Sequence, residues 1–188
     1  EEGVSLQQTN YNQALYFHAI GTPQTDDLRI FDSPEHPDWS AGSDVSEDGR
    51  YLVISVWKDT SNTNQLYVQE LGVDAAPQAI VSDFEAGFYF LGNEGDRLFF
   101  MSNEEAPRWK VLALDLASEP SWSEVVGQQE EAMNSAALVG SRLGLTYLQD
   151  ARALVNVHEL NGEHVTALAL PGLGSVRGFG GRQDDPET

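Results

Sequence analysis

The sequence predicts an all-β fold in which a unit of four short antiparallel strands repeats along the chain. Three observations predict it: short apolar or alternating runs separated by turn residues, an arginine that opens each second strand, and an acidic-Leu pair that closes each third strand. These landmarks are Arg50, Arg97 and Arg142, and Leu71, Leu116 and Leu160. The arginines are 47 (97 − 50) and 45 (142 − 97) residues apart, and the leucines 45 (116 − 71) and 44 (160 − 116). Such a period is typical of a β-propeller blade.

Half a unit precedes the first complete one. Residues 15–21 (LYFHAIG) alternate and predict a strand, and 28–31 predict a short partner strand. In the first complete unit, Asp48-Gly49 precedes a β-branched and aromatic run, a strong hairpin signal because glycine accepts the positive φ of such a turn. This unit has an inner strand from Gly42, a turn at 47–49, a second strand at 50–56, a loop at 58–64, a third strand at 65–71 and an outer strand at 79–82.

The next two units repeat this order. The second has an inner strand at 86–92, a turn at 93–96, strands at 97–101, 109–116 and 122–126, and the loop SNEEAP between its second and third strands. The third has an inner strand at 135–139, a turn at 140–141, strands at 142–148, 153–160 and 164–170, and a loop at 149–151. A further inner strand is expected to begin at 175–178.

We therefore predict one partial β-propeller over residues 1–188. It comprises a partial blade at 11–32, complete blades at about 40–82, 86–126 and 134–170, and the start of another at 174–188. A β-sandwich also has many short strands, but it has no reason to repeat its landmarks at a fixed interval. Closed propellers have about four to eight blades, so we expect open sheet edges through which the chain self-associates.

The charge of the chain is strongly acidic. It has 10 basic and 30 acidic residues among 188, a net charge of −20, and no cysteine. Phosphate contacts need Lys and Arg, so we expect neither nucleic acid nor an anionic membrane as a partner. The acidity serves solubility, or it attracts cationic ligands. No apolar run approaches the ~18 residues of a membrane span, and the acidic, polar N-terminal segment does not resemble a signal peptide. Both ends look like positions within a longer protein.

Catalytic and metal-binding patterns are missing from the sequence. There is no G-x-S-x-G elbow, and Ser175 lies in GLGSVRG, where no helix follows to make a phosphate site. The histidines, at positions 18, 36, 158 and 164, lack metal-ligand spacing. Paired acids lie in loops, where a calcium site is the alternative to solvated carboxylates. We expect no catalytic residue, no metal site and no cofactor in this chain.

Several stretches together resemble one family. LYFHAIGTPQTDDLRIF, PDWSAGSDVSEDGRYLVISV, NQLYVQEL, FEAGFYFLGNEGDRLFFMSNEEAPRWKVLALDL and LPGLGSVRGFGG, in this order, are similar to the propeller domain of prolyl oligopeptidases, serine peptidases that cleave short peptides after proline. The resemblance implies a seven-bladed propeller that caps an α/β-hydrolase domain and admits oligopeptides but not folded proteins. It places the catalytic Ser, Asp and His in the hydrolase domain, beyond this chain, which is then inactive alone. It also implies a cytoplasmic location, with the periplasm as the alternative.

In a propeller, the loops between second and third strands and the connections from outer to inner strands emerge on one face. Here these are 58–64, 103–107, 149–151, and the connections around Trp39, 84–86 and 129–134. If this face meets the hydrolase domain, the SNEEAP loop reaches toward the peptide. Members of the family can carry a substrate-contacting arginine there; here Glu104 stands at that position and Arg108 is the nearest basic residue. Asn103, Glu104 and Arg108 are thus the candidate substrate-facing residues, and the alternative is an ordinary domain-contact loop.

Two other functions remain open from the residues alone. One is a free-standing β-propeller that serves as a binding scaffold without enzymatic activity. The other is an acidic carbohydrate- or calcium-binding β domain. Acids of the predicted loop face could attract peptides with a cationic terminus; they are Asp59, Glu104, Glu105, Glu130, Glu131 and Asp150.

Overall fold

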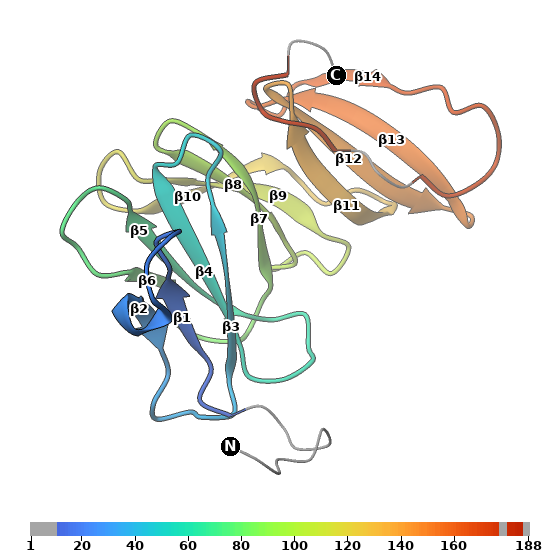
Figure 1. The fold of residues 1–188 in the computed structure, drawn as a ribbon. Coiled ribbons are helices and arrows are strands. Elements are labelled where there is room, and N and C mark those ends of the chain that lie inside the picture. Colours follow the sequence, from blue (N-terminus) through green and yellow to red (C-terminus); the bar gives the residue numbers. More distant parts are fainter. Residues whose placement is uncertain (1–10, 177–179, 186–188) are drawn as a thin grey trace. The chain divides into compact units, whose positions relative to one another are not determined.

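The computed structural model describes residues 11–176 and 180–185. In this part of the chain the regular structure is fourteen β-strands and one short 3-10 helix, and the paired strands are antiparallel (Figure 1). The strands form one two-stranded and three four-stranded sheets, which confirms the predicted all-β class. The chain divides into two compact units, 1–45 with 49–84 and 46–48 with 85–188. Among the described residues, no helix is both long and apolar enough to traverse a lipid bilayer.

The first unit contains the two-stranded sheet and one four-stranded sheet. The two-stranded sheet pairs β1 (Ala14–Phe17) with β2 (Leu28–Asp32), and the 3-10 helix η1 (Gln24–Asp26) lies between them in sequence. The four-stranded sheet has the order β3 (Ser40–Val45), β4 (Tyr51–Trp57), β5 (Gln65–Glu70) and β6 (Gln78–Val81). Its core includes Val53, Ile54, Val56 and Leu66, all essentially inaccessible to solvent.

Two sequence predictions for the first unit have clear outcomes. The Asp-Gly hairpin is confirmed, because Gly49 has a φ of +72° in the turn between β3 and β4. The strand predicted at 15–21 is too long, because β1 ends at Phe17. The chain then turns, with the amide and hydroxyl of Thr22 both donating to the Ala19 carbonyl at 3.1 and 2.7 Å.

The second unit contains two four-stranded sheets. One has the order β7 (Phe88–Glu94), β8 (Arg97–Ser102), β9 (Lys110–Asp115) and β10 (Ser121–Val126). The other has β11 (Ala132–Val139), β12 (Arg142–Gln149), β13 (Arg152–Glu159) and β14 (His164–Ala167).

Most predicted strands of the second unit agree with these bounds within about three residues. The turn predicted at 93–96 is wrong in its first half, because β7 continues through Glu94 after an irregularity in register between Phe90 and Gly92. The outer strand predicted at 164–170 ends at Ala167. Of the inner strand predicted at 175–178, residues 175 and 176 are not in a strand, and 177 and 178 lie outside the described residues.

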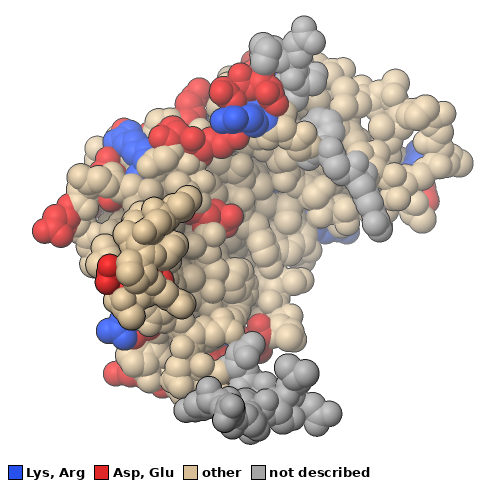
Figure 2. All heavy atoms as spheres, in the orientation of Figure 1, with Lys and Arg blue, Asp and Glu red and all other residues tan. Residues whose placement is uncertain are grey.

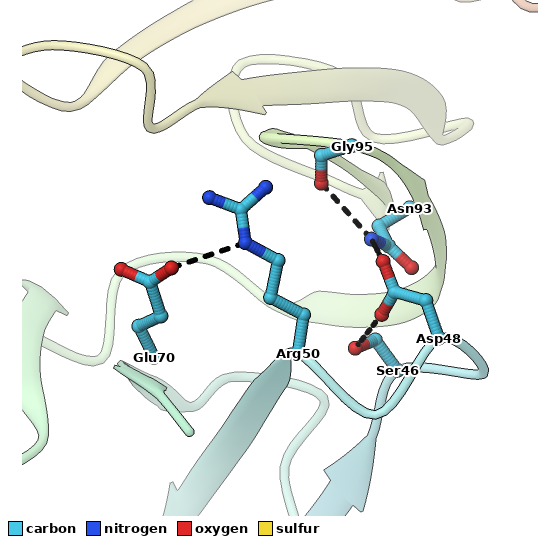
Figure 3. A network of polar contacts seen from close by, with 6 residues as sticks. All are labelled: Ser46, Asp48, Arg50, Glu70, Asn93 and Gly95. Carbon is cyan, nitrogen blue, oxygen red and sulfur yellow. Dashed lines mark hydrogen bonds and ion pairs between the residues drawn. The ribbon is translucent and has the colours of Figure 1, made fainter. Parts of the chain in front are cut away.

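The repeated landmarks are neighbours across the second and third strands of each sheet. Arg97 pairs in register with Asp115, and Arg142 with Glu159. The Nε atom of Arg142 lies 3.3 Å from Glu159 Oε1, and that of Arg50 lies 3.0 Å from Glu70 Oε1 (Figure 3). Opposite charges directly across an antiparallel pair are favourable. The 45-residue repeat therefore places an arginine across from a carboxylate in each four-stranded sheet, and in two of these sheets the pair makes an ion pair.

A single hydrophobic core joins the two sheets of the second unit. Phe99 of β8 and Leu143 and Leu145 of β12 are completely buried in it. It also contains Val111, Ala113, Val126, Met133, Leu138, Tyr147 and Leu160. Each of the two sheets contributes one apolar face to this core. Such packing is expected between adjacent propeller blades.

Tyr147 places a phenol inside this core without a hydrogen-bond partner among the described residues, and its side chain is 2% exposed. Burial, together with the nearby Glu131 carboxylate, raises the pKa of Tyr147 to about 12 from 10.0. Because the unfolded chain releases this proton at a lower pH than the folded chain, Tyr147 lowers stability as the pH rises from about 10 to 12.

We expect Tyr147→Phe to leave the free energy of unfolding at pH 7 unchanged or to raise it by up to about 1 kcal/mol, because the change removes an unpaired buried hydroxyl. The variant should also lose less stability than the wild type between pH 10 and 12. Urea unfolding across this pH range measures both effects. Tyr16→Phe, at a tyrosine that is 58% exposed, is the matched control. A loss above about 1 kcal/mol in Tyr147→Phe would mean that the hydroxyl has a partner.

Candidate functional site

The SNEEAP loop between β8 and β9 is held by two consecutive turns. The Ala106 amide donates to the Asn103 carbonyl at 3.1 Å, and the Trp109 amide donates to the Ala106 carbonyl at 2.8 Å. Ala106 is buried, whereas Glu104 and Glu105 are exposed. The loop is thus an ordered structure that presents two carboxylates to solvent.

Asn103 fastens this loop to the start of its own sheet. Its side-chain Oδ1 accepts a hydrogen bond from the Gly87 amide at 2.7 Å, and its own amide donates to the Gly87 carbonyl at 3.4 Å. Gly87 is a buried residue, so its amide needs an acceptor within the protein. The side-chain oxygen of Asn103 is therefore occupied by the backbone.

Arg108 fastens the loop to the connection between β10 and β11. Its Nη1 donates to the Glu130 carbonyl at 2.6 Å, its amide donates to Gln128 Oε1 at 2.7 Å, and its carbonyl accepts from the Met133 amide at 2.9 Å. Three separate groups of Arg108 thus hold one neighbouring segment in place. This accounts for the basic residue at this position without a substrate.

Glu104 is the candidate whose side chain is most open to a ligand. Its amide donates to Ser102 Oγ at 3.1 Å, and its Oε2 lies 3.9 Å from Lys110 Nζ. The Glu104 side chain is 47% exposed and that of Lys110 is 11% exposed. Asn103, Glu104 and Arg108 share one loop, but their side chains turn to three different partners. The structure does not gather them into one cluster.

In the second unit, the loops predicted to share one face are bonded to each other. Arg108 links the β8–β9 loop to the β10–β11 connection, and Glu131 Oε1 of that connection accepts a hydrogen bond from Gln149 Nε2 at 2.6 Å. Gln149 in turn accepts from Arg152 Nη2 at 2.7 Å across the β12–β13 turn. The two sheets of this unit therefore present these three segments on a common side, as predicted.

The first unit has an arrangement built on aromatic rings, and it involves the segments around Trp39, 58–64 and 84–86 that were predicted to share one face. Trp39, just before β3, stacks on His36 with ring centroids 3.8 Å apart and meets Phe84 edge-on at 4.8 Å. Lys58 of the β4–β5 loop lies over Phe84, with Nζ 4.9 Å from the ring centroid. In the same loop, hydrogen bonds from Ser61 lower the pKa of Asp59. The common face of these segments was predicted from the sequence, but the ring contacts themselves were not.

Negative charge is spread over the loops and turns of the chain. Figure 2 shows that Asp and Glu side chains outnumber Lys and Arg on the visible face. Among residues 11–176 and 180–185, no three His, Asp or Glu side chains lie together in a way that could hold a metal ion.

Repeated four-stranded antiparallel sheets, a period of about 45 residues and a shared inter-sheet core define a segment of a β-propeller. Comparison with known families shows which family of β-propellers this segment resembles. The family described as "Prolyl oligopeptidase, N-terminal beta-propeller domain" matches residues 1–188, so the chain belongs to this family.

Individual relatives agree with the family assignment. Prolyl oligopeptidase A of Amanita bisporigera is 30% identical over 177 residues, which cover 90% of this chain and 23% of that protein. A solved structure from a study of two prolyl endopeptidases and their inter-domain dynamics superimposes with a TM-score of 0.90 and 35% identity, covering 95% of this chain and 27% of that one. Prolyl oligopeptidase B from Galerina marginata, solved bound to a 35mer hydrolysis and macrocyclization substrate, has a TM-score of 0.85, 27% identity and coverages of 93% and 26%. The chain thus spans about a quarter of the length of these relatives.

Proposed function

We propose that this chain is the substrate-gating part of a prolyl oligopeptidase-like serine endopeptidase that cleaves short peptides on the C-terminal side of proline. An α/β-hydrolase domain of the same parent protein would supply the catalytic Ser, Asp and His. The observation that carries this proposal is the match of the whole chain to the propeller domain of this family. The interlocked loops of each unit support it, because they form an ordered surface suited to bordering a cavity between domains.

The proposal is tested on the full-length protein that carries these residues. We expect it to hydrolyse a short chromogenic peptide after proline and to leave a folded protein with exposed proline loops intact. Cleavage of the folded protein at a comparable rate would contradict the gating role. A full-length protein made only of propeller repeats, with no peptidase activity, would instead establish the binding scaffold.

The acidic loop suggests which peptides are preferred. We propose that Glu104 and Glu105 attract oligopeptides with a cationic terminus into the cavity. Charge reversal at both positions should raise KM for cationic peptides about two- to fivefold at low salt and have little effect at high salt, where such fields are screened. The matched control is the same reversal at Glu119 and Glu163. These residues lie in the turns that follow β9 and β13, at the ends of these strands away from the loops that precede them. An unchanged KM and salt dependence in the loop variant would refute the attraction.

A chain limited to these 188 residues should also self-associate. Within the described residues, β1 pairs only with β2, so its other edge presents unpaired backbone groups. Tyr16 and Phe17 of β1 and Leu28 of β2 are each more than half exposed. Sedimentation should therefore show concentration-dependent association, and a monomer at all concentrations would argue against it.

A further inference from the structure

Residues 180–185 lie across the turn that joins β11 to β12. The Gly140 amide donates to the Arg182 carbonyl at 3.0 Å, and the Ser141 amide donates to the Gln183 carbonyl at 3.1 Å. The segment is itself a closed turn, because the Arg182 amide donates to Asp185 Oδ2 at 2.8 Å and the Asp185 amide donates to the Arg182 carbonyl at 3.2 Å. A compact turn thus supplies partners to two amides of another hairpin.

Gln183 also reaches the neighbouring sheet, 90 residues earlier in the chain. Its side-chain Oε1 accepts a hydrogen bond from the Asn93 amide at 2.9 Å, near the end of β7. β7 is the edge strand of its sheet, and the Asn93 amide takes this side-chain oxygen as its acceptor. The side chain of Gln183 therefore bonds the edge strand of one sheet, while its backbone carbonyl bonds the turn of the other sheet.

The turn at residues 46–48 completes the arrangement. The Gln183 amide donates to Glu47 Oε2 at 2.5 Å, and Arg182 Nε lies 3.7 Å from Glu47 Oε1. Beside them, Asn93 Nδ2 donates to Asp48 Oδ2 at 2.8 Å and to the Gly95 carbonyl at 3.0 Å (Figure 3). A hollow of about 400 Å³ lies between this turn and residues 182–184, which form one of its walls.

Gly92 shows that β7 is shaped to receive Gln183. Its φ is +145°, a conformation that residues with a Cβ rarely adopt, and a Cβ at this position would collide with the Gln183 carboxamide. The irregular register between Phe90 and Gly92 lies at the same point. Position 92 therefore has room only for a hydrogen atom while Gln183 is in place.

We propose that residues 180–185 form a strap that fastens the β7 edge to the β11–β12 turn, with Gln183 as its anchor. Release of the strap would free the Asn93 amide, loosen the two sheets at this end and open the adjacent hollow. The ion pairs of Arg182 are solvent-exposed and weak, so the hydrogen bonds of Gln183 to Asn93, Ser141 and Glu47 carry the attachment. The strap uses no residue of the acidic loop, so its test does not depend on peptidase activity.

Hydrogen exchange on the full-length protein tests the strap. In Gln183→Ala, the amide of Asn93 should exchange roughly five- to tenfold faster, and those of Gly140 and Ser141 should also accelerate. Gly92→Ala displaces Gln183 and also strains the backbone next to Asn93, so its readout is faster exchange at Gly140 and Ser141. Gln183→Glu keeps an acceptor oxygen and should stay near the wild type at Asn93.

Two control substitutions are available in the chain. Gln129→Ala removes a glutamine whose side-chain amide donates to the nearby Gly127 carbonyl, and Gly172→Ala adds a methyl group where no atom lies within 4 Å. Neither should change exchange at Asn93. The strap is overturned if Gln183→Ala leaves the Asn93 rate unchanged, or if it accelerates every amide of the second unit equally.

Discussion

Phe99→Ala should lower the free energy of unfolding by about 3–5 kcal/mol, at the upper end of the range expected for a single core substitution. Phe99 is completely buried in the core shared by the two sheets, where Leu143 and Leu145 are equally inaccessible. Removing its ring loses the transfer free energy of the buried carbons and leaves a cavity that a strand in the middle of a sheet cannot move to fill. Urea unfolding followed by tryptophan fluorescence measures the change.

Two further substitutions separate cavity formation from a general loss of apolar surface. Phe99→Leu keeps most of the volume and should cost less than half as much as Phe99→Ala. Leu148→Ala, at a leucine of β12 that is 53% exposed, should change the free energy of unfolding by less than about 0.5 kcal/mol. If Phe99→Ala costs no more than Leu148→Ala, the two sheets do not share a tightly packed core.

Asn103→Ala should lower the free energy of unfolding by about 1–3 kcal/mol, because it leaves the buried Gly87 amide without an acceptor. Asn103→Asp keeps an oxygen in the same place and should cost less. Both variants are measured by thermal or urea unfolding, with KM for a proline-containing peptide determined in parallel on the full-length protein.

The same pair of variants decides between two roles for Asn103. If Asn103 anchors the loop, Asn103→Ala should lower stability, and Asn103→Asp should be nearly normal in both stability and KM. If Asn103 instead contacts the substrate, both variants should have a raised KM and an unchanged free energy of unfolding. The hydrogen bonds to Gly87 favour the anchoring role.

The hairpins were predictable because their information is local. An Asp-Gly turn and an alternating run need only the residues within them, and Gly49 and β4 follow that pattern. One error occurred where a local pattern met a non-local requirement. β7 extends into the first half of the expected turn, and its bulge lies where Gln183, 90 residues away from Asn93 in sequence, approaches the strand.

The loop between β8 and β9 shows the same difference between local features, which the sequence predicts, and non-local contacts, which it does not. Its position between β8 and β9 and its exposed carboxylates could be read from the SNEEAP stretch. The partners of its polar groups could not, because Asn103 bonds a residue 16 positions earlier and Arg108 bonds one 22 positions later. No periodicity relates those positions, so a basic residue near the expected substrate position could not be distinguished from one that holds a neighbouring segment.

The sequence by itself determined the all-β class, the four-strand repeat and the family resemblance, because turn chemistry, strand alternation and the spacing of arginine and acidic landmarks are properties of short segments. Only the tertiary structure decided which polar groups are free to meet a ligand and which are already bonded within the protein. Glu104 remains largely open, whereas Asn103, Arg108 and Gln183 are engaged. The reason is that hydrogen-bond partners are set by how whole sheets pack, which brings together residues that no local pattern connects.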